Sequence, residues 1–265
     1  MLIIAGSRGM IGAGILSARG ALRSGAGLVT LAVPKDQQAS VIKHLSPEAM
    51  TLGLSESSAI PSVLGFMKKR RITSLVIGPG LSRKTQARTF VRKLLPRLGS
   101  FPTLKGIVLD ADGFIALSGT EILKKMKIPV IVTPHAGELS LFTGTKTSAS
   151  PAGRKGQAEK FAKLNRVICV LKGHRTVVAS GRATFVNPTG NPGMARGGSG
   201  DVLSGMIGAL LPNVRPPEAA FKAACAGVYV HGLAGDLAAR EKTEIAMSAG
   251  DLAEKIPSAF KKILR

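Results

Sequence analysis

The 265-residue chain has few aromatic and sulfur-containing side chains: no tryptophan, one tyrosine and two cysteines. Aromatic residues that stack on the bases of single-stranded nucleic acids are therefore scarce. Cys169 and Cys225 stand in apolar stretches, without the spacing of a metal site or a disulfide framework. No apolar run is long enough to span a membrane, and no basic residue precedes the apolar N-terminus, which disfavours a signal peptide. We expect a cytoplasmic protein without a membrane partner.

Acidic residues are also few, with 15 Asp and Glu against 37 Lys and Arg, for a net charge of +22. Such a charge raises nucleic-acid binding as one interpretation. The basic residues are scattered in short groups, however, and no DNA- or RNA-reading motif accompanies them. A solvated basic surface around polyanionic small-molecule substrates is the favoured interpretation, and we expect no specific nucleic-acid partner.

Glycine, in contrast, is abundant, and seven of the 32 glycines fall within residues 187–211. The run from Gly197 to Gly200 leads into Asp201, after which apolar residues recur with the spacing of one helix face. A glycine-rich loop that enters a helix presents free N–H groups and the positive end of the helix dipole. This stretch therefore predicts a site for an anion such as a phosphate.

Asp201 itself has two interpretations. Aspartate is a favoured N-cap residue, so Asp201 could simply begin the helix. An acidic side chain beside a phosphate site is also suited to take a proton from a hydroxyl that attacks phosphorus. The density of glycine before Asp201 exceeds what a cap requires and favours the second interpretation. No Gly-Lys-Ser/Thr follows the loop, so it is not a Walker A loop.

Strands and helices alternate along the chain without a linker or repeat. Apolar strands are expected near residues 2–5, 28–33, 75–77, 107–110, 130–132 and 167–171, with a hairpin over 176–186. Helices are expected over residues 13–24, 83–98, 201–211 and 217–240, and over 248–264, where Pro257 predicts a break or kink. This order predicts an α/β fold with a doubly wound, mostly parallel sheet and helices on both faces.

The glycine-rich stretch, NPTGNPGMARGGSGDVL, is similar to the signature of the ADP/ATP-dependent (S)-NAD(P)H-hydrate dehydratases, a branch of the ribokinase-like superfamily; Arg196 and Ser199 each stand where that signature has threonine. The resemblance implies a single ribokinase-like domain over residues 1–265, without the epimerase domain of some relatives and with a short N-terminus. It also implies a homo-tetramer that uses ADP or ATP, with Mg²⁺, to return NAD(P)H-hydrate to NAD(P)H.

Four further motifs extend the resemblance: GSRGMIGA, GPGLS, TPHAGE and KGHRT. By resemblance, Ala13, Gly80, His135 and Asp201 contact the hydrate, and Glu138 helps to place Mg²⁺ through water. The amides of Gly198, Ser199 and Gly200 hold the transferring phosphoryl group, with Asp201 as the base. The implied nucleotide site consists of Lys172, Gly173, His174, Arg175, Thr176 and Gly200.

Several of these residues also have plainer interpretations. Lys172 suits a nucleotide phosphate, or is a lysine that faces solvent from a turn. Asp110 and Asp112 follow a strand and should point into the crevice where α/β sheets bind ligands, although Asp112 could be a cap. Arg196 either reaches phosphate oxygens or points to solvent. His231, in a helix rich in small residues, is interpreted as structural.

Two other functions stay open at this point. The same fold and loop serve small-molecule kinases, for instance of vitamin precursors, in which the phosphorylated alcohol is the product. The stretch NPTGNPGM together with TPHAGE favours the dehydratase. A basic nucleic-acid-binding protein is the third possibility, and the intact glycine loop with Asp201 argues against it.

Overall fold

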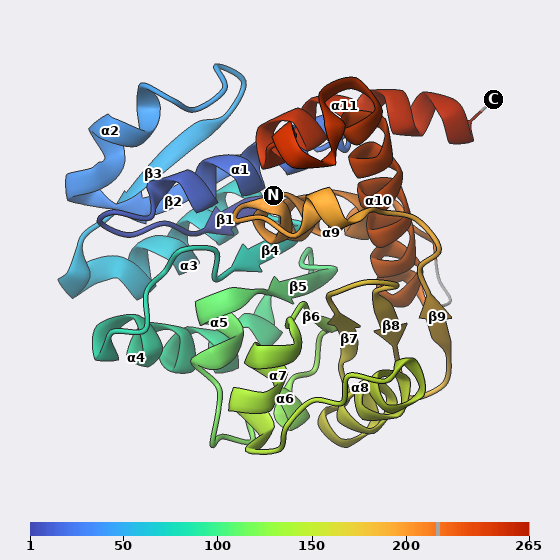
Figure 1. The fold of residues 1–265 in the computed structure, drawn as a ribbon. Coiled ribbons are helices and arrows are strands. Elements are labelled where there is room, and N and C mark those ends of the chain that lie inside the picture. Colours follow the sequence, from blue (N-terminus) through green and yellow to red (C-terminus); the bar gives the residue numbers. More distant parts are fainter. Residues whose placement is uncertain (216–217, 265) are drawn as a thin grey trace.

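The computed structural model describes residues 1–215 and 218–264. Its centre is a nine-stranded sheet with the order β3-β2-β1-β4-β5-β6-β7-β8-β9 (Figure 1). Strands β1 to β7 are parallel, whereas β8 and β9 pair antiparallel. The strands are β1 Leu2–Ile4, β2 Thr30–Pro34, β3 Met50–Leu54, β4 Ser74–Ile77, β5 Gly106–Leu109, β6 Val130–Val132, β7 Ile168–Leu171, β8 Val177–Ala179 and β9 Thr184–Val186.

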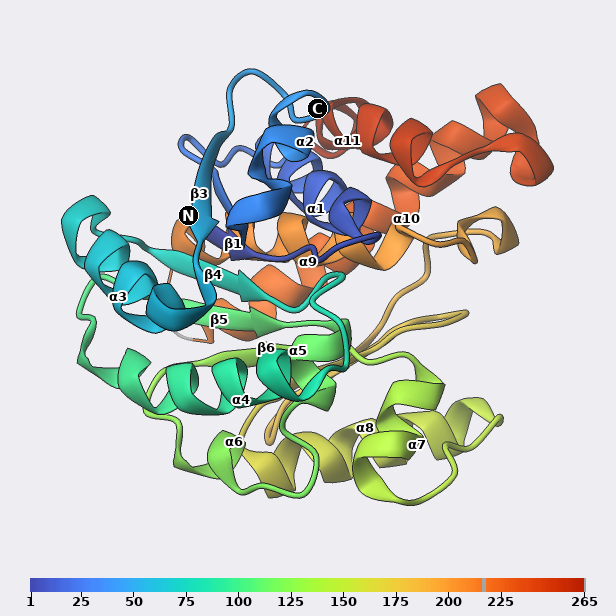
Figure 2. The same ribbon diagram turned by 90° about the vertical axis from the view of Figure 1, so that its left-hand side faces the viewer.

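Helices cover both faces of this sheet. They are α1 Ile11–Arg23, α2 Gln38–Ile42, α3 Ala59–Arg70, α4 Thr85–Leu94, α5 Ala111–Ile115, α6 Ile122–Lys125, α7 Ala136–Thr143, α8 Pro151–Asn165, α9 Ser199–Leu210, α10 Ala219–Ala246 and α11 Ala249–Ile263. Figure 2 shows α4 and α8 below the strands and α1, α9 and α10 above them.

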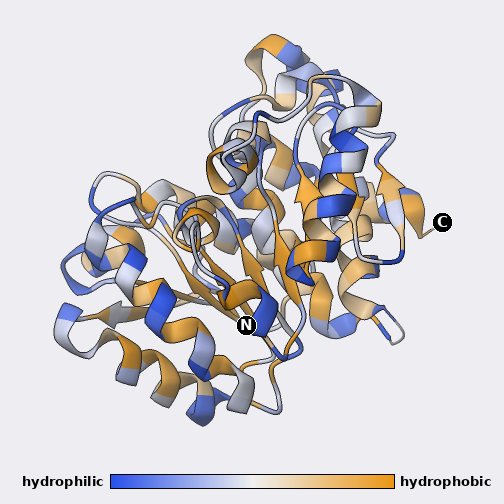
Figure 3. Ribbon diagram, turned by 90° about the horizontal axis from the view of Figure 1, so that it is seen from below, coloured by the Kyte–Doolittle hydropathy of each residue, from blue (hydrophilic) through white to orange (hydrophobic). Residues whose placement is uncertain are grey.

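The alternation of side chains along each strand produces the two faces. In β1, Leu2 and Ile4 pack into the cluster under α3, α4 and α8, whereas Ile3 packs into the cluster under α1, α9 and α10. Both faces are covered, so the central parallel strands are largely apolar, as their hydrophobic colour shows (Figure 3). A third apolar cluster joins α9, α10 and α11.

Helices α1 and α9 approach each other unusually closely. A Cβ placed on Gly205 of α9 would lie 1.9 Å from the carbonyl oxygen of Ser17, and one on Gly20 of α1 would lie 2.3 Å from that of Val202. The hydroxyl oxygens of Ser17 and Ser204 lie 3.3 Å apart within this contact. Only glycine allows backbones to pack at this distance, which explains why two helix interiors contain it.

The expected fold class is confirmed, but several boundaries differ. The hairpin is β8 and β9, and the helix expected over 83–98 is α4 followed by a 3₁₀ segment, Leu95–Ser100. The break expected at Pro257 was wrong, because α11 continues through this exposed residue. The expected start of the preceding helix at Pro217 lies outside the described residues, and α10 runs on to Ala246 with a kink at Thr243.

Strand β3 and helices α2, α3, α5, α6, α7 and α8 were not predicted from the sequence. Every residue of β3 is half-buried, so the strand lacks both an apolar run and a clear alternation. Both cysteines are free, as expected. Within the described ranges, each helix is too short or too polar to cross a bilayer.

The strand order reverses direction at β1. From β1 the chain proceeds outward through β2 to β3, and then returns to the other side of β1 as β4. Open α/β sheets bind ligands outside the carboxyl ends of the strands at such a switch point. The loops that follow β1 and β4 therefore form one side of the candidate site, and those that follow β5, β6 and β7 form the other.

Candidate active site

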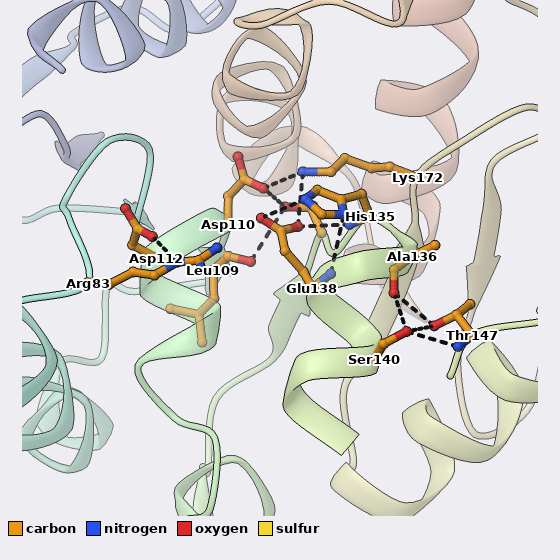
Figure 4. A network of polar contacts seen from close by, with 11 residues as sticks. Arg83, Leu109, Asp110, Asp112, His135, Ala136, Glu138, Ser140, Thr147 and Lys172 are labelled. Atoms are coloured by element: carbon orange, nitrogen blue, oxygen red, sulfur yellow. Dashed lines mark hydrogen bonds and ion pairs between the residues drawn. The ribbon is translucent and has the colours of Figure 1, made fainter. Parts of the chain in front are cut away.

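A buried polar cluster lies where β5, β6 and β7 end (Figure 4). Asp110, directly after β5, is 1% exposed. Its Oδ1 accepts hydrogen bonds of 2.7 Å from the Thr133 hydroxyl and 2.7 Å from the Lys172 ammonium. Its Oδ2 is buried and has no hydrogen-bond partner among the described residues. A carboxylate with one free oxygen thus faces the site.

Helix α7 begins at the same edge with a reciprocal cap. The Nδ1 atom of His135 accepts from the Glu138 amide at 3.2 Å, and Oε2 of Glu138 accepts from the His135 amide at 2.8 Å. The His135 side chain is 58% exposed, whereas that of Glu138 is 8% exposed. His135 is therefore accessible to a ligand, and Glu138 is held beneath it.

Lys172 joins these carboxylates to the glycine loop. Its ammonium lies 3.8 Å from Oε2 of Glu138, and a Cβ placed on Gly200 would lie 3.1 Å from the same nitrogen. Burial acts to lower the pKa of Lys172, but the carboxylates of Asp110 and Glu138 outweigh it, and the net pKa is raised. The interpretation of Lys172 as a solvent-facing turn residue was therefore wrong: its positive charge is fixed inside the site.

Helix α9 begins at Ser199, with Gly198 as its N-cap at a φ of +95°. This left-handed conformation favours glycine. Asp201 lies in the first turn of the helix, so its interpretation as the N-cap was wrong. The amide of Ser199 donates to the Arg196 carbonyl at 3.4 Å, and no such acceptor exists for the amides of Gly198 and Gly200 within the described chain. These two amides are available to an anion.

Asp201 has the most perturbed carboxyl group in the cluster. Burial, together with the nearby carboxylates of Asp110 and Glu138, raises its pKa to about 7, and the Lys172 ammonium only partly offsets this. A group with this pKa changes its protonation state near neutral pH, which is what proton transfer requires. Asp201 is thus suited to act as a general base.

Helix α10 holds the loop that precedes α9. The carboxylate of Asp236 accepts from the Gly190 amide and from the Asn191 side-chain amide, both at 3.0 Å. His231 is buried, and its Nε2 lies 2.9 Å from the Ser199 carbonyl oxygen. Burial lowers the pKa of His231 to about 4, so the ring is neutral and donates this hydrogen bond. The structural interpretation of His231 is confirmed.

Arg196 fits neither of its two interpretations. Its Nε donates to the Gly193 carbonyl at 2.9 Å, and its Nη2 donates to the carbonyls of Glu244, at 2.9 Å, and Ile245. The guanidinium therefore ties the loop to the end of α10, beside the kink at Thr243. It is not a free surface charge, and its hydrogen bonds go to backbone carbonyls and not toward the phosphate site.

The switch-point side of the site is formed by the loops after β1 and β4. The Gly6 amide donates to the Pro79 carbonyl at 2.7 Å. A Cβ on Gly80 would lie 3.0 Å from that of Ala13, so these two predicted hydrate contacts are neighbours. Asp112 accepts from the Ser82 amide at 2.9 Å and contacts Arg83 at 3.4 Å, and so joins this turn to the loop after β5.

The predicted nucleotide turn, residues 172–176, follows β7. Gly173, His174 and Arg175 are exposed, and the Thr176 hydroxyl donates to the Gly173 carbonyl at 3.0 Å. Arg154 of α8 donates to the carbonyls of Leu171, Lys172 and His174 at 3.4, 3.3 and 2.7 Å. Backbone hydrogen bonds to Pro134 and from Asn187 hold the two ends of the turn, and the Arg154 guanidinium supports the part between them.

Sequence interpretation missed part of this arrangement. Asp110 was noted at a strand end, but neither its partner Thr133 nor its contact with Lys172 could be inferred. Arg154, which supports the turn after β7, and Asp236, which supports the loop before α9, were not recognised. The only available signal was indirect: Asp236 is the first acid of α10 and lies in the Ala- and Gly-rich part of this helix.

The donor set is compatible with a hydrated magnesium ion. Within the described chain no three His, Cys, Asp or Glu side chains form a ready metal cluster. Mg²⁺ keeps several of its waters and is usually held by one or two carboxylates and the substrate phosphates, so such a cluster is not required. The free Oδ2 of Asp110 and the buried Glu138 are the fitting ligands.

The sheet order, with helices on both faces and a glycine loop opposite the carboxyl ends of β5 to β7, defines the ribokinase-like class, and a solved ribokinase-like superfamily protein from Enterococcus faecalis shares this fold. Within this class, the chain belongs to the NAD(P)H-hydrate dehydratase family, whose model matches residues 1–258. The family and fold expected from the sequence motifs are therefore confirmed.

Three relatives illustrate the similarity. A bifunctional NAD(P)H-hydrate repair enzyme from Moorella thermoacetica is 40% identical over 99% of this chain and 49% of its own length. An ADP-dependent (S)-NAD(P)H-hydrate dehydratase from Neisseria meningitidis is 35% identical, covering 98% of this chain and 82% of the relative. The solved Bacillus subtilis ADP/ATP-dependent NAD(P)H-hydrate dehydratase, co-crystallised with ATP and Mg²⁺, has a TM-score of 0.78 at 30% identity, covering 98% and 90% of the two chains. The chain spans about half the length of the bifunctional relatives.

Proposed function

We propose that this chain catalyses the ADP- or ATP-dependent dehydration of (6S)-NAD(P)H-hydrate to NAD(P)H. The observation that carries the proposal is Asp201, a half-buried carboxyl with a pKa of about 7 in the first turn of α9, beside two free loop amides. The chain's family and the names of its relatives supply the substrate. The nucleotide is the phosphoryl donor.

In the proposed reaction, Asp201 takes the proton of the C6 hydroxyl of the hydrate, and the oxygen attacks the terminal phosphorus of ADP. The bond from that phosphorus to the bridging oxygen breaks, and AMP leaves. The amides of Gly198 and Gly200 stabilise the negative charge on the transferring group. They can do so because, among the described residues, neither donates to a backbone carbonyl. The fixed charge of Lys172 lies close to the same loop.

The phosphate ester then decomposes. The lone pair of the ring nitrogen expels phosphate from C6, and loss of a proton from C5 forms the double bond of the reduced nicotinamide. A magnesium ion, when bound with the nucleotide, would neutralise charge on its phosphates; Asp110 and, through water, Glu138 would hold it.

We further propose that Ala13, Gly80 and His135 contact the hydrate and that residues 172–176 contact the nucleotide. In support, Ala13 and Gly80 are neighbours, and His135 is exposed at the same edge of the sheet. Tetrameric assembly, which the resemblance implies, and a cytoplasmic location, which the sequence composition favours, stay predictions.

The direct test is to incubate purified protein with NADH-hydrate and either ADP or ATP. Recovery of the absorbance of the reduced nicotinamide, with one AMP or ADP released per turnover, is expected only when nucleotide and Mg²⁺ are present. Accumulation of a phosphorylated hydrate without this recovery would instead indicate a small-molecule kinase. Absence of turnover with both nucleotides would contradict the proposed function.

A further inference from the structure

A large pocket adjoins the candidate active site on its switch-point side. It has a volume of about 1270 Å³ and lies at the carboxyl ends of β1, β2 and β3, between α3 and α4. This volume exceeds the roughly 300–1,000 Å³ of an ordinary small-molecule site. Its apolar lining includes Ile4, Val33, Leu54, Ile60, Leu64 and Phe90. The proposed roles of Asp201, Lys172 and the glycine loop do not involve these residues.

The pocket is continuous with the turn that is proposed to contact the hydrate. Gly6 and Ser7, after β1, line it on one side, and Leu81 and Ser82, after Gly80, line it on the other. The hydrogen bond from the Gly6 amide to the Pro79 carbonyl holds these two loops together. The Ser7 hydroxyl has no hydrogen-bond partner among the described residues. A ligand that contacts Gly80 can thus extend directly into the pocket.

The charge of the lining favours an anionic ligand. Four cationic side chains, Lys35, Lys84, Lys93 and Arg97, line the pocket against two acidic ones, Asp36 and Glu56. In the described chain, none of these four cations forms an ion pair. The pocket therefore combines an apolar wall with unpaired positive charge, which suits a purine that carries phosphate groups.

The phosphoryl donor is not the occupant. The proposed nucleotide turn follows β7, which is four strands away from β1 in the sheet, or about 19 Å at the usual strand spacing. The pocket extends in the opposite direction, over β1, β2 and β3. The donor and the occupant of the pocket would therefore approach the end of β5, where Asp110 lies, from opposite sides.

We propose that this pocket binds the adenosine-phosphate end of the dinucleotide hydrate, while the hydrated nicotinamide ring lies at Gly80 and Asp201. This inference rests on the proposed function and deepens it. It makes the pocket the element that distinguishes a dinucleotide from a mononucleotide substrate. Binding energy from this remote end would orient the ring for phosphoryl transfer.

The test compares two substrates: NADH-hydrate and the hydrate of reduced nicotinamide mononucleotide, which lacks the adenosine end. The wild-type protein should show a kcat/KM at least about tenfold higher for the dinucleotide. Ala87→Trp places bulk in the pocket from half-buried Ala87 of α4, and should remove most of this preference by lowering kcat/KM for NADH-hydrate alone. The KM for ADP should not change.

A second variant, which changes charge and adds no bulk, keeps the test valid if Ala87→Trp does not fold. The double variant Lys84→Gln/Lys93→Gln alters two exposed side chains, and should raise the KM for NADH-hydrate about threefold or more at low salt without affecting the mononucleotide. Lys163→Gln, which alters an exposed lysine of α8 outside the pocket, is the matched control and should change neither substrate.

Three results would overturn the assignment. They are equal kcat/KM of the wild type for both hydrates, an equal loss on both hydrates in Ala87→Trp, and wild-type kinetics in both pocket variants. In each of these cases dehydration of NADH-hydrate persists in the wild type, so the proposed function survives. Wild-type protein that dehydrates neither hydrate would remove the proposed function, and this inference with it.

Discussion

The loop before α9 and the turn after β7 both face the phosphates of the proposed reaction, but they are held very differently. The loop is fixed by Asp236, by His231, and by Arg196 through the end of α10. The turn exposes three successive residues between its two anchored ends, and the Arg154 side chain supports this exposed part. Catalytic donors are most effective when they need no rearrangement as charge develops. We therefore propose that the loop takes part in the chemistry and that the turn binds the donor.

The largest effect is expected from removal of the proposed base. Asp201→Asn keeps the size of the side chain but cannot accept the hydroxyl proton, so turnover of NADH-hydrate with ADP should fall by roughly 10²–10⁴-fold. Steady-state kinetics with saturating nucleotide measures this directly. A well-folded variant with near-normal turnover would show that the loop side does not carry the proton transfer.

The same group should determine the pH dependence of the reaction. Because its pKa is raised to about 7, kcat/KM should rise about tenfold per pH unit below that value and become constant above it. The raised pKa also makes the stability of the fold depend on pH, because the folded state favours the neutral form of Asp201. This stabilisation is complete below the usual pKa of 3.8 and is lost as pH rises through about 7.

Asp201→Asn should therefore gain about 2–4 kcal/mol of stability relative to wild type between pH 4 and pH 8. Denaturant unfolding at these two values checks the sign. If the free energy of unfolding of Asp201→Asn minus that of wild type does not increase from pH 4 to pH 8, the raised pKa is contradicted.

Loosening the loop should have the next largest effect. Asp236→Ala removes the acceptor of the Gly190 amide and the Asn191 side chain, so we expect turnover to fall roughly 10–50-fold with a stability loss of about 1–3 kcal/mol. Asp236→Asn keeps one acceptor oxygen and should give an intermediate loss. If both variants change only the KM for ADP, the division between loop and turn is wrong.

Loosening the turn should act on the nucleotide instead. Arg154→Met leaves three carbonyls of the turn without their donor, so the KM for ADP should rise roughly five- to tenfold while kcat changes less than threefold. Lys155→Met alters the neighbouring exposed lysine of α8 and serves as control. A large fall in kcat in Arg154→Met would give the turn a part in the chemistry.

The smallest effect on catalysis is expected at Arg196. Arg196→Thr restores the residue of the family signature and removes donors to three backbone carbonyls, at an exposed position. Stability should fall by about 1 kcal/mol, or a melting temperature about 2–4 °C lower. Both kinetic constants should stay within twofold of wild type. Arg240→Thr, also an exposed arginine, should change neither property.

The sequence predicted those parts of the molecule that depend on local pattern. Buried parallel strands are continuous apolar runs, and a glycine-rich run before a helix has few alternative conformations, so both were recognised. Strand β3 was missed because its half-buried residues show neither pattern. The position of Asp201 was misjudged by three residues, because a glycine in the left-handed conformation caps α9 in its place.

The supporting residues of the site were beyond such patterns. Arg154 contacts carbonyls 17 to 20 positions along the chain, and Asp236 contacts amides 45 and 46 positions away. The residues next to Arg154 in the sequence do not indicate whether its guanidinium supports a distant turn. The raised pKa of Asp201 likewise arises from burial and from the carboxylates of Asp110 and Glu138, which only the fold brings together.

The contact between α1 and α9 also limits how this protein can change. Ala13 lies near the start of one helix and Asp201 near the start of the other, and the glycines at their crossing leave no room for a methyl group on either backbone. This tight packing couples the two helices, so the distance from Ala13 to Asp201, the proposed substrate contact and the proposed base, depends on one helix contact. Selection for a new substrate has to act elsewhere, on the turn after β4 or on the lining of the neighbouring pocket, where side chains can vary one at a time.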